Sequence, residues 1–149
     1  MSLTFDVLRQ ANIARLSQFR NKHGDLAHRT PDGSDWSPAQ WLQALIGELG
    51  ELANERKKFE RGDLTIAEFQ EKAARELADV QTYLDIYAQR ILDIVDDGRV
   101  VHSHPTGVNL GEATIQKFNE VSRRVDANVF ITHTFVDGKW LSHVAGGKL

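Results

Sequence analysis

The sequence predicts an all-α fold of four helices, followed by a β-hairpin at the C-terminal end. Four stretches repeat apolar residues at helical spacing, and three of them open with side chains suited to cap a helix. After residue 125 the pattern changes to alternation around Asp137 and Gly138, a pair that strongly favours a tight hairpin turn. We therefore expect a helical domain over residues 1–125 and a hairpin tail over residues 126–149.

A long polar loop separates the first two helices. Residues 4–20 carry apolar side chains about every three or four positions and predict the first helix. The segment NKHGDLAHRTPDGSDW follows; its two glycines and its proline predict a loop long enough to serve a function. The second helix begins at SPAQ, where Ser37 caps, Pro38 takes the first helical position and Gln40 completes a capping box. We expect this helix to end near Phe59.

The third helix begins at TIAE by the same logic, with Thr65 as the cap and Glu68 three residues later. Its apolar stripe continues through Ile91 and Val95, and DDG ends it at Gly98. A connector then leads to residue 108. We expect the second and third helices to lie antiparallel, because only a short turn joins them.

The fourth helix and the hairpin close the chain. NLGE offers Asn109 and Glu112 as a third capping box, and the helix is expected to end near Arg124. An isolated two-stranded hairpin is marginal in water, so the hairpin must pack on the helices or on another subunit. The turn at Asp137 implies two cross-strand pairs, Phe135 with Trp140 and Ile131 with Val144.

Composition excludes several kinds of protein. A formal charge of −3 argues against a nucleic-acid-binding domain, which usually carries a basic excess. The chain has no cysteine, so disulfides and thiolate metal sites are impossible. No apolar stretch approaches the ~20 residues that span a bilayer, and the first residues lack a signal-peptide pattern. We expect a cytoplasmic protein, or one made by a virus inside a cell, with no membrane partner.

Two carboxylate pairs stand out on adjacent helices. Glu48 and Glu51 lie three residues apart on the second helix, and Glu76 and Asp79 lie three apart on the third. Residues at this spacing share a helix face, and leucines of the apolar stripes flank both pairs. Carboxylates that converge between two helices repel one another unless a cation lies among them, and Mg²⁺ prefers such oxygen ligands. The pattern favours a magnesium site, with Mn²⁺ as the alternative.

Glycines beside the first pair strengthen this interpretation. A single ExxE pair is most often a solvated helix face. However, Gly47 and Gly50 flank Glu48, and a glycine inside a helix costs ~1 kcal/mol relative to alanine. Absent side chains at these positions would let a ligand or another backbone approach closely. We interpret the two pairs together as a functional site.

These motifs resemble those of the MazG-like all-α nucleoside triphosphate pyrophosphohydrolases. ALIGELGELANE followed by ELADVQTYLDIYA is similar to the ExxE and ExxD helices of that superfamily, and NLGEATIQKFNEVSRR resembles the helix that follows them. The resemblance covers about residues 37–125. It implies a four-helix bundle completed by oligomerisation, as a homodimer or homotetramer. It also implies hydrolysis of a (d)NTP to a (d)NMP and pyrophosphate, with Glu48, Glu51, Glu76 and Asp79 as metal ligands or, for one glutamate, as the group that activates water.

The resemblance also suggests residues that contact substrate. Lys117 matches a family lysine that approaches the phosphates, and Asn119 is a polar neighbour on the same helix. Tyr83 lies one turn beyond Asp79, where relatives can place a tyrosine near the nucleotide, although core packing is an equal alternative. Each of the three has a purely structural alternative, as a surface or core residue.

At one position the sequence departs from the pattern that some relatives use to recognise a base. Lys58 occupies roughly the position where some pyrimidine-specific members, of the dCTPase and dUTPase type, place a tryptophan. No base preference is therefore carried over; Lys58 instead belongs to a basic run that is either solvated or in contact with a triphosphate. Trp36, at the end of the long loop, is the better candidate to stack on a base, while Trp41 is expected in the core.

Three functions remain open from the sequence. The leading one is a Mg²⁺-dependent pyrophosphohydrolase that removes or balances canonical or damaged nucleotides. The second is a phosphoribosyl-ATP pyrophosphohydrolase, which has the same helical core. The third is a catalytically silent helical protein that binds nucleotide or a partner chain, and the complete set of four carboxylates disfavours it.

Overall fold

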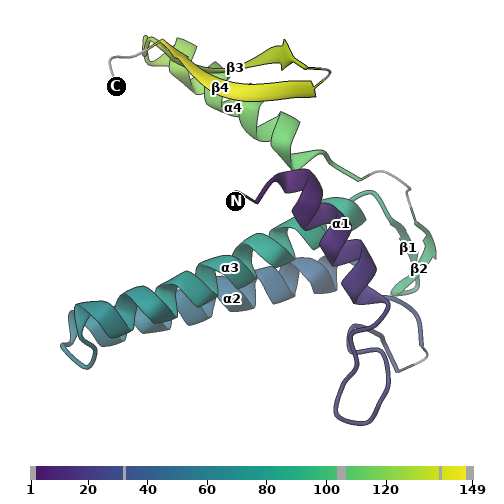
Figure 1. Cartoon of the computed structure of the whole chain (residues 1–149). Coiled ribbons are helices and arrows are strands. Elements are labelled where there is room, and N and C mark those ends of the chain that lie inside the picture. The colour runs from purple at the N-terminus through teal and green to yellow at the C-terminus, as the bar shows by residue number, and fades with distance from the viewer. Residues whose placement is uncertain (1–2, 32, 104–106, 138, 147–149) are drawn as a thin grey trace. The chain divides into compact units, whose positions relative to one another are not determined.

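A computed structural model of the chain describes residues 3–31, 33–103, 107–137 and 139–146. Within these residues it contains four helices and two separate antiparallel hairpins, so the protein is mainly helical (Figure 1). The predicted class is confirmed at that level. The chain divides into two compact units, residues 1–108 and residues 109–149, and each is described by itself.

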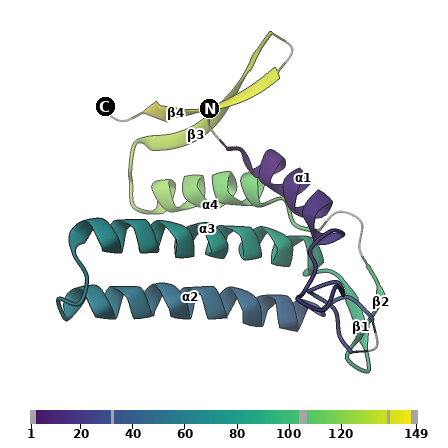
Figure 2. The same cartoon turned by 60° about the horizontal axis from the view of Figure 1, so that its bottom comes forward.

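Two long helices lie side by side and antiparallel in both views (Figures 1 and 2). They are α2 (Pro38–Glu60) and α3 (Ile66–Arg90). Both predicted capping boxes are present. The Ser37 hydroxyl accepts a hydrogen bond from the backbone N–H of Gln40, and the Thr65 hydroxyl accepts one from that of Glu68. The side chains of Gln40 and Glu68 accept from the cap residues' own N–H groups, so these four residues fix where each helix begins.

Helix α1 (Phe5–Leu16) is shorter than predicted and contacts α3 through polar groups. Asp85 is 1% exposed and accepts hydrogen bonds from Arg9 Nε at 2.8 Å and from Asn12 Nδ2 at 2.9 Å. Asn12 is itself buried, whereas Phe5 stays 38% exposed. The predicted end of this helix near residue 20 is therefore wrong, and its buried contact with α3 is a hydrogen-bonded ion pair.

The prediction that the third helix continues to Gly98 is also wrong. The helix ends at Arg90, and a short hairpin follows. Its strands are β1 (Ile94–Asp96) and β2 (Arg99–His102). Asp97 and Gly98 both have positive φ, 45° and 76°, which is the backbone of a two-residue hairpin turn. Val95 and Ile91 happen to continue the helical spacing, but β-branched residues on both sides of Asp-Gly favour strands.

The chain returns to the end of α3 through a close backbone contact. The Val108 N–H donates to the Ala88 carbonyl at 2.8 Å. Gly107 has φ +55°, and a Cβ added there would lie 2.5 Å from the same carbonyl oxygen. Only glycine fits this position, because a side chain would clash with the backbone of α3.

In the second unit a hairpin packs against a helix. Its elements are α4 (Leu110–Arg124), β3 (Val129–Val136) and β4 (Lys139–Gly146). The side-chain amide of Asn119 joins α4 to β3, donating to the Ile131 carbonyl and accepting from the Ile131 N–H, both at 2.8 Å. Asn109 caps α4, but the Glu112 carboxylate accepts from Gln116 instead of completing the predicted third box.

The predicted register of this hairpin is confirmed. The backbone pairs Phe135 with Trp140 and Ile131 with Val144 around the Asp137 turn. Contacts group α4 with the hairpin in residues 109–149, whereas the sequence analysis divided the chain at residue 125. That division stays a prediction about domains.

The core of the described residues is small. Their buried apolar side chains are Trp41, Leu45, Ile86 and Ala88. Large apolar side chains along α2 and α3 remain exposed, among them Leu42, Ile46, Leu49, Leu77 and Leu84. The helix pair thus leaves much apolar surface in contact with solvent. No helix among the described residues is both long enough and apolar enough to cross a membrane.

Candidate metal centre

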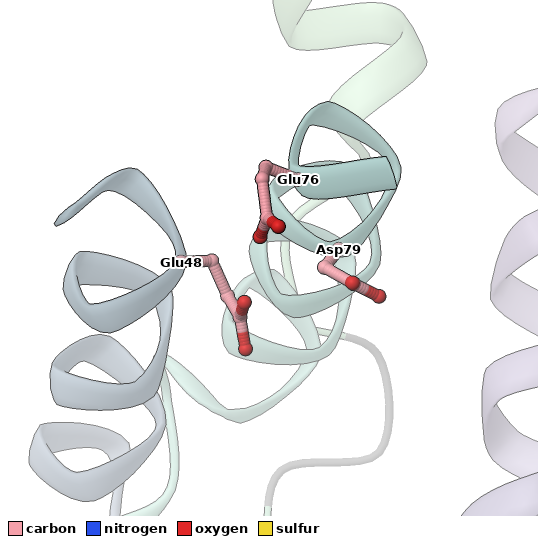
Figure 3. Close-up of side chains that lie close together, drawn as sticks. All are labelled: Glu48, Glu76 and Asp79. Atoms are coloured by element: carbon pink, nitrogen blue, oxygen red, sulfur yellow. The ribbon is translucent and has the colours of Figure 1, made fainter. Parts of the chain in front are cut away.

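Three carboxylates meet where α2 and α3 run side by side. Glu48 comes from α2, and Glu76 and Asp79 come from one face of α3. One carboxylate oxygen from each residue lies within 4.8 Å of the other two. Figure 3 shows the side chains of Glu48 and Glu76 extending into the space between the helices. We call these three residues the acidic cluster; the sequence spacing predicted all three of them.

Apolar packing turns these carboxylates toward each other. Along α2, Leu45 is buried and Leu52 is half-buried, and they lie three residues before and four residues after Glu48. Residues at those spacings share one helix face, so the contact that buries the leucines also carries Glu48 to the α3 side. On α3, the half-buried Ala73 and Val80 lie three residues before and four residues after Glu76. They therefore share its face, which packs toward α2.

Glu51 is not brought into the acidic cluster. Each residue turns an α-helix by about 100°, so Glu51 lies about 60° around α2 from Glu48. Its side chain is exposed. It remains close enough that its charge helps to raise the pKa of Glu48. The predicted set of four carboxylates is thus found as three in close contact and one beside them.

The electrostatics of the acidic cluster favour a cation. Partial burial raises the pKa of Glu48, and the charges of Asp79, Glu51 and Glu76 raise it further, in that order. Within the described part of the chain, no arginine, lysine or histidine forms an ion pair with Glu48, Glu76 or Asp79. Mutual repulsion is therefore not relieved by a side chain, and a bound cation would relieve it.

The donor set fits a hard divalent ion. Oxygens that share one Mg²⁺ at about 2.1 Å lie at most about 4.2 Å apart, so a spacing of up to 4.8 Å must close by about 0.6 Å. Rotation of the exposed Asp79 side chain can supply such a movement. Carboxylate oxygens without thiolate or imidazole partners suit Mg²⁺ or Mn²⁺ better than zinc.

The two glycines beside Glu48 border open space. Apart from the adjoining residues and the nearby backbone of α2 itself, a Cβ added at Gly47 or at Gly50 would meet no atom of the described chain within 4 Å. No backbone of the same described chain therefore approaches α2 closely at these glycines. Close approach by a ligand or by a second copy of the chain stays a prediction.

An aromatic cluster adjoins the carboxylates. Tyr83 lies one turn beyond Asp79, and its pKa is raised by burial first and then by the charges of Glu48 and Asp79. The Tyr83 ring contacts Trp41, with centroids 6.3 Å apart, and its hydroxyl lies 3.5 Å from His28 Nε2. Trp41 is fully buried, which confirms its expected place in the core. These rings connect the acidic cluster to the long loop.

His28 is the centre of this aromatic cluster, and sequence reasoning missed it. Its ring stacks on Phe19 at 5.1 Å and contacts Trp36 edge-on at 4.8 Å. Burial lowers the pKa of His28; the Asp35 carboxylate partly offsets that effect, and the Arg15 charge adds to it. Trp36 is half-buried against His28 and Trp41. The unusual length of the loop was the one sequence signal that pointed here.

Arg15 is a second residue that the sequence analysis did not single out. It lies on α1 with its guanidinium 6.0 Å from the centre of the Phe19 ring, and it donates to Asn12 Oδ1 at 3.3 Å. Its charge adds slightly to the lowering of the His28 pKa that burial causes, and it offsets a small part of the rise in the Tyr83 pKa. An exposed cation therefore lies beside the aromatic cluster.

A cavity of about 550 Å³ opens beside His28, between α1, the long loop and the end of α3. Three arginines line it, and two of them are in ion pairs. Arg9 binds Asp85 at 2.8 Å, and Arg90 binds Asp35 at 2.9 Å. The third, Arg29, donates to a backbone carbonyl instead, so carboxylates balance two of the three positive charges that line the cavity.

The remaining predicted residues already have protein partners. Lys58 donates to Glu55 on its own helix. Lys117 is exposed and pairs with Glu120 at 2.8 Å, while both ends of the Asn119 amide bind the backbone of β3. Lys117 and Asn119 belong to residues 109–149, so their part in the site stays a prediction.

Comparison with protein-family models, curated proteins and solved structures finds no match to this chain. Membership of the MazG-like superfamily therefore stays a prediction that rests on the motifs in α2, α3 and α4. The geometry of the acidic cluster is an independent observation, because it depends only on how α2 and α3 pack.

Proposed function

We propose that this protein is a Mg²⁺-dependent nucleoside triphosphate pyrophosphohydrolase, converting a (d)NTP and water to a (d)NMP and pyrophosphate. The observation that carries the proposal is the acidic cluster of Glu48, Glu76 and Asp79, which no described side chain neutralises. The resemblance of the ExxE and ExxD motifs supports the same reaction. The proposed substrate carries several negative charges, which these carboxylates could not approach without a cation between them.

Glu48, Glu76 and Asp79 would hold the ion, with Mn²⁺ as an alternative to Mg²⁺. When bound, the ion supplies neutralisation of phosphate charge and acidifies a coordinated water. Burial and then the charges of the neighbouring carboxylates raise the pKa of Glu48, and a bound cation would offset both effects. The protein's own contribution is a firm backbone frame, since all three side chains project from long helices and not from loops.

Glu51 is the group best placed to handle the proton of the attacking water. It lies beside the acidic cluster without joining it, and its exposed carboxylate is free of lysine or arginine partners in the described chain. The water oxygen forms a bond to the α-phosphorus while the bond from that phosphorus to the bridging oxygen breaks. Glu51 accepts the water's proton, and pyrophosphate leaves.

We further propose that the active form is a homodimer or homotetramer. The described residues bury few apolar side chains, and those left exposed on α2 and α3 could pack against a second copy. Sedimentation should therefore detect an oligomer at micromolar concentration. A stable, active monomer would contradict this part of the proposal.

The reaction is tested by its products. A panel of NTPs, dNTPs and phosphoribosyl-ATP is incubated with Mg²⁺, and pyrophosphate is measured. In ¹⁸O-labelled water the label should enter the monophosphate, because the attack is at the α-phosphorus. Label in pyrophosphate or orthophosphate, or no reaction with any member of the panel, would sink the proposal. A preference for phosphoribosyl-ATP over every NTP and dNTP would instead identify the protein as a phosphoribosyl-ATP pyrophosphohydrolase.

A further inference from the structure

A second charged group lies on the same helix pair, between α2 and α3. Glu55 of α2 is bound by two lysines, one from each helix. Lys58 Nζ donates to Glu55 Oε1, and Lys72 Nζ of α3 lies 3.7 Å from Glu55 Oε2. The Glu55 side chain is only 12% exposed, while those of Lys58 and Lys72 are 43% and 47% exposed. We call these three residues the lysine bridge.

The lysine bridge lies one helical turn from the acidic cluster. Lys72 precedes Glu76 by four residues on α3, so the two share a face and are separated by about 6 Å of helix rise. Tyr83 and the aromatic cluster lie in the opposite direction along α3. The helix pair therefore presents cations on one side of the carboxylates and aromatic rings on the other.

Lys72 is held less firmly than Lys58. Its contact with Glu55 is an ion pair at 3.7 Å, longer than a hydrogen bond, and Glu55 Oε2 accepts no hydrogen bond from any described residue. An ion pair this exposed contributes little stability. Lys72 can therefore leave Glu55 for a stronger anion without disturbing the helices, since about half of its side chain is already in solvent.

We propose that Lys72, with Lys58 beside it, binds the terminal phosphates of the triphosphate and receives the pyrophosphate that leaves. This rests on the proposed function and adds a direction to it. The triphosphate lies along α3 with its terminal phosphates toward the turn between α2 and α3 and its nucleoside toward Tyr83. Glu55 is a positioning residue, which keeps both lysines between the helices when no phosphate is present and competes with phosphate for them.

The test compares matched substitutions. Lys72→Gln removes the charge and should raise both KM and the inhibition constant for magnesium pyrophosphate about tenfold, the usual size of one charge-assisted contact. Lys57→Gln is the control, because Lys57 is exposed and lies about 200° around α2 from Glu55. It should change neither constant. Glu55→Gln should act in the opposite direction and tighten pyrophosphate binding about threefold, since the competitor has lost its charge.

The opposite signs separate a binding role from a structural one. If the lysine bridge only stabilised the helices, Lys72→Gln and Glu55→Gln would change the constants in the same direction. Equal inhibition constants for Lys72→Gln and Lys57→Gln, with wild-type activity intact, would overturn this inference and leave the proposed function standing. If the wild-type protein hydrolyses no triphosphate, calorimetric titration with magnesium pyrophosphate still decides. If magnesium pyrophosphate binds the wild-type protein and binds Lys72→Gln more weakly, the phosphate site is supported. If it binds both proteins equally, or does not bind the wild-type protein, the site is rejected.

Discussion

The acidic cluster and the lysine bridge lie on the same two helices and treat their carboxylates in opposite ways. Glu55 has a lysine from each helix within ion-pairing distance. About two turns away along α2, Glu48 and its two neighbours on α3 have carboxylate oxygens within 4.8 Å of one another, without an ion pair in the described chain. Both groups occupy the side of α2 that faces α3, so burial alone does not explain the difference.

The two helices thus carry lysines that pair with the Glu55 carboxylate, while no lysine of the described chain pairs with the acidic cluster. The pKa of Glu48 is raised by burial and by its neighbours' charges, so its carboxylate destabilises the fold. A lysine partner for Glu48, or a neutral residue in its place, would make the helix pair more stable. Carboxylates that destabilise the protein alone, and become favourable with an ion, are typical of functional sites. Experiments that exchange the properties of the two groups test this interpretation.

The largest effect is expected from the acidic cluster. Asp79→Asn keeps the shape of the side chain but removes a charge that would hold the ion. Turnover with Mg²⁺ should fall about a thousandfold, which corresponds to about 4 kcal/mol of transition-state stabilisation. Steady-state kinetics measure the change, and circular dichroism should show that the helices still form.

The matched control for Asp79→Asn is Glu60→Gln, at the end of α2. Glu60 pairs with Arg56 at 2.7 Å on an exposed surface, where such pairs contribute little. Its substitution should leave turnover within about twofold, since surface changes usually have small effects. Near-normal activity of Asp79→Asn, or equal losses in both variants, would remove Asp79 from the site.

A smaller effect is expected on stability when the ion binds. An ion that binds only the folded protein adds about 2.7 kcal/mol at one hundred times its dissociation constant. Thermal unfolding of the wild-type protein should therefore shift to higher temperature with Mg²⁺, in the absence of any nucleotide. The shift should persist in Glu60→Gln and disappear in Asp79→Asn. An equal shift in all three proteins would mean that Mg²⁺ acts elsewhere.

Local sequence signals predicted the parts of the fold that depend on neighbouring residues. The capping boxes at Ser37 and Thr65 placed the starts of α2 and α3, and Asp137 placed the second hairpin with its register. The hairpin at Asp97 carries the same signal as the one at Asp137. It was overlooked because apolar residues before it continue the helical spacing of α3, so two periodicities compete over one segment.

Tertiary contacts account for what the sequence could not supply. Spacing predicted Glu48, Glu76 and Asp79, because residues three apart share a helix face. The rotation of α2 about its axis decides that Glu48 joins the acidic cluster and that Glu51 stays outside it. His28 reaches Tyr83 only because the loop after α1 folds back over 55 residues of sequence separation. No periodicity encodes such a contact, and the same holds for the lysine bridge, which depends on how α3 packs on α2.

The smallest expected effect concerns stability without metal. Glu48 has a raised pKa in the folded protein, so the folded state binds its proton more tightly than the unfolded chain does. That contribution to stability is complete below the unfolded pKa of a glutamate, about 4.3. It is lost as pH rises through the higher folded pKa. In EDTA, the free energy of unfolding should therefore fall with rising pH more steeply in the wild-type protein than in Glu48→Gln.

At pH 8 in EDTA, Glu48→Gln should unfold at a higher temperature than the wild-type protein, because a neutral amide is not repelled by Asp79, Glu51 and Glu76. At pH 4 the two proteins should be nearly equal. Saturating Mg²⁺ at pH 8 should reverse the order, since only the carboxylate would gain from the ion. Glu55→Gln serves as the comparison, because its carboxylate has lysine partners and a lowered pKa; without metal it should lose stability at pH 8. If both variants moved in the same direction, the two carboxylate groups would not differ in the way that their contacts imply.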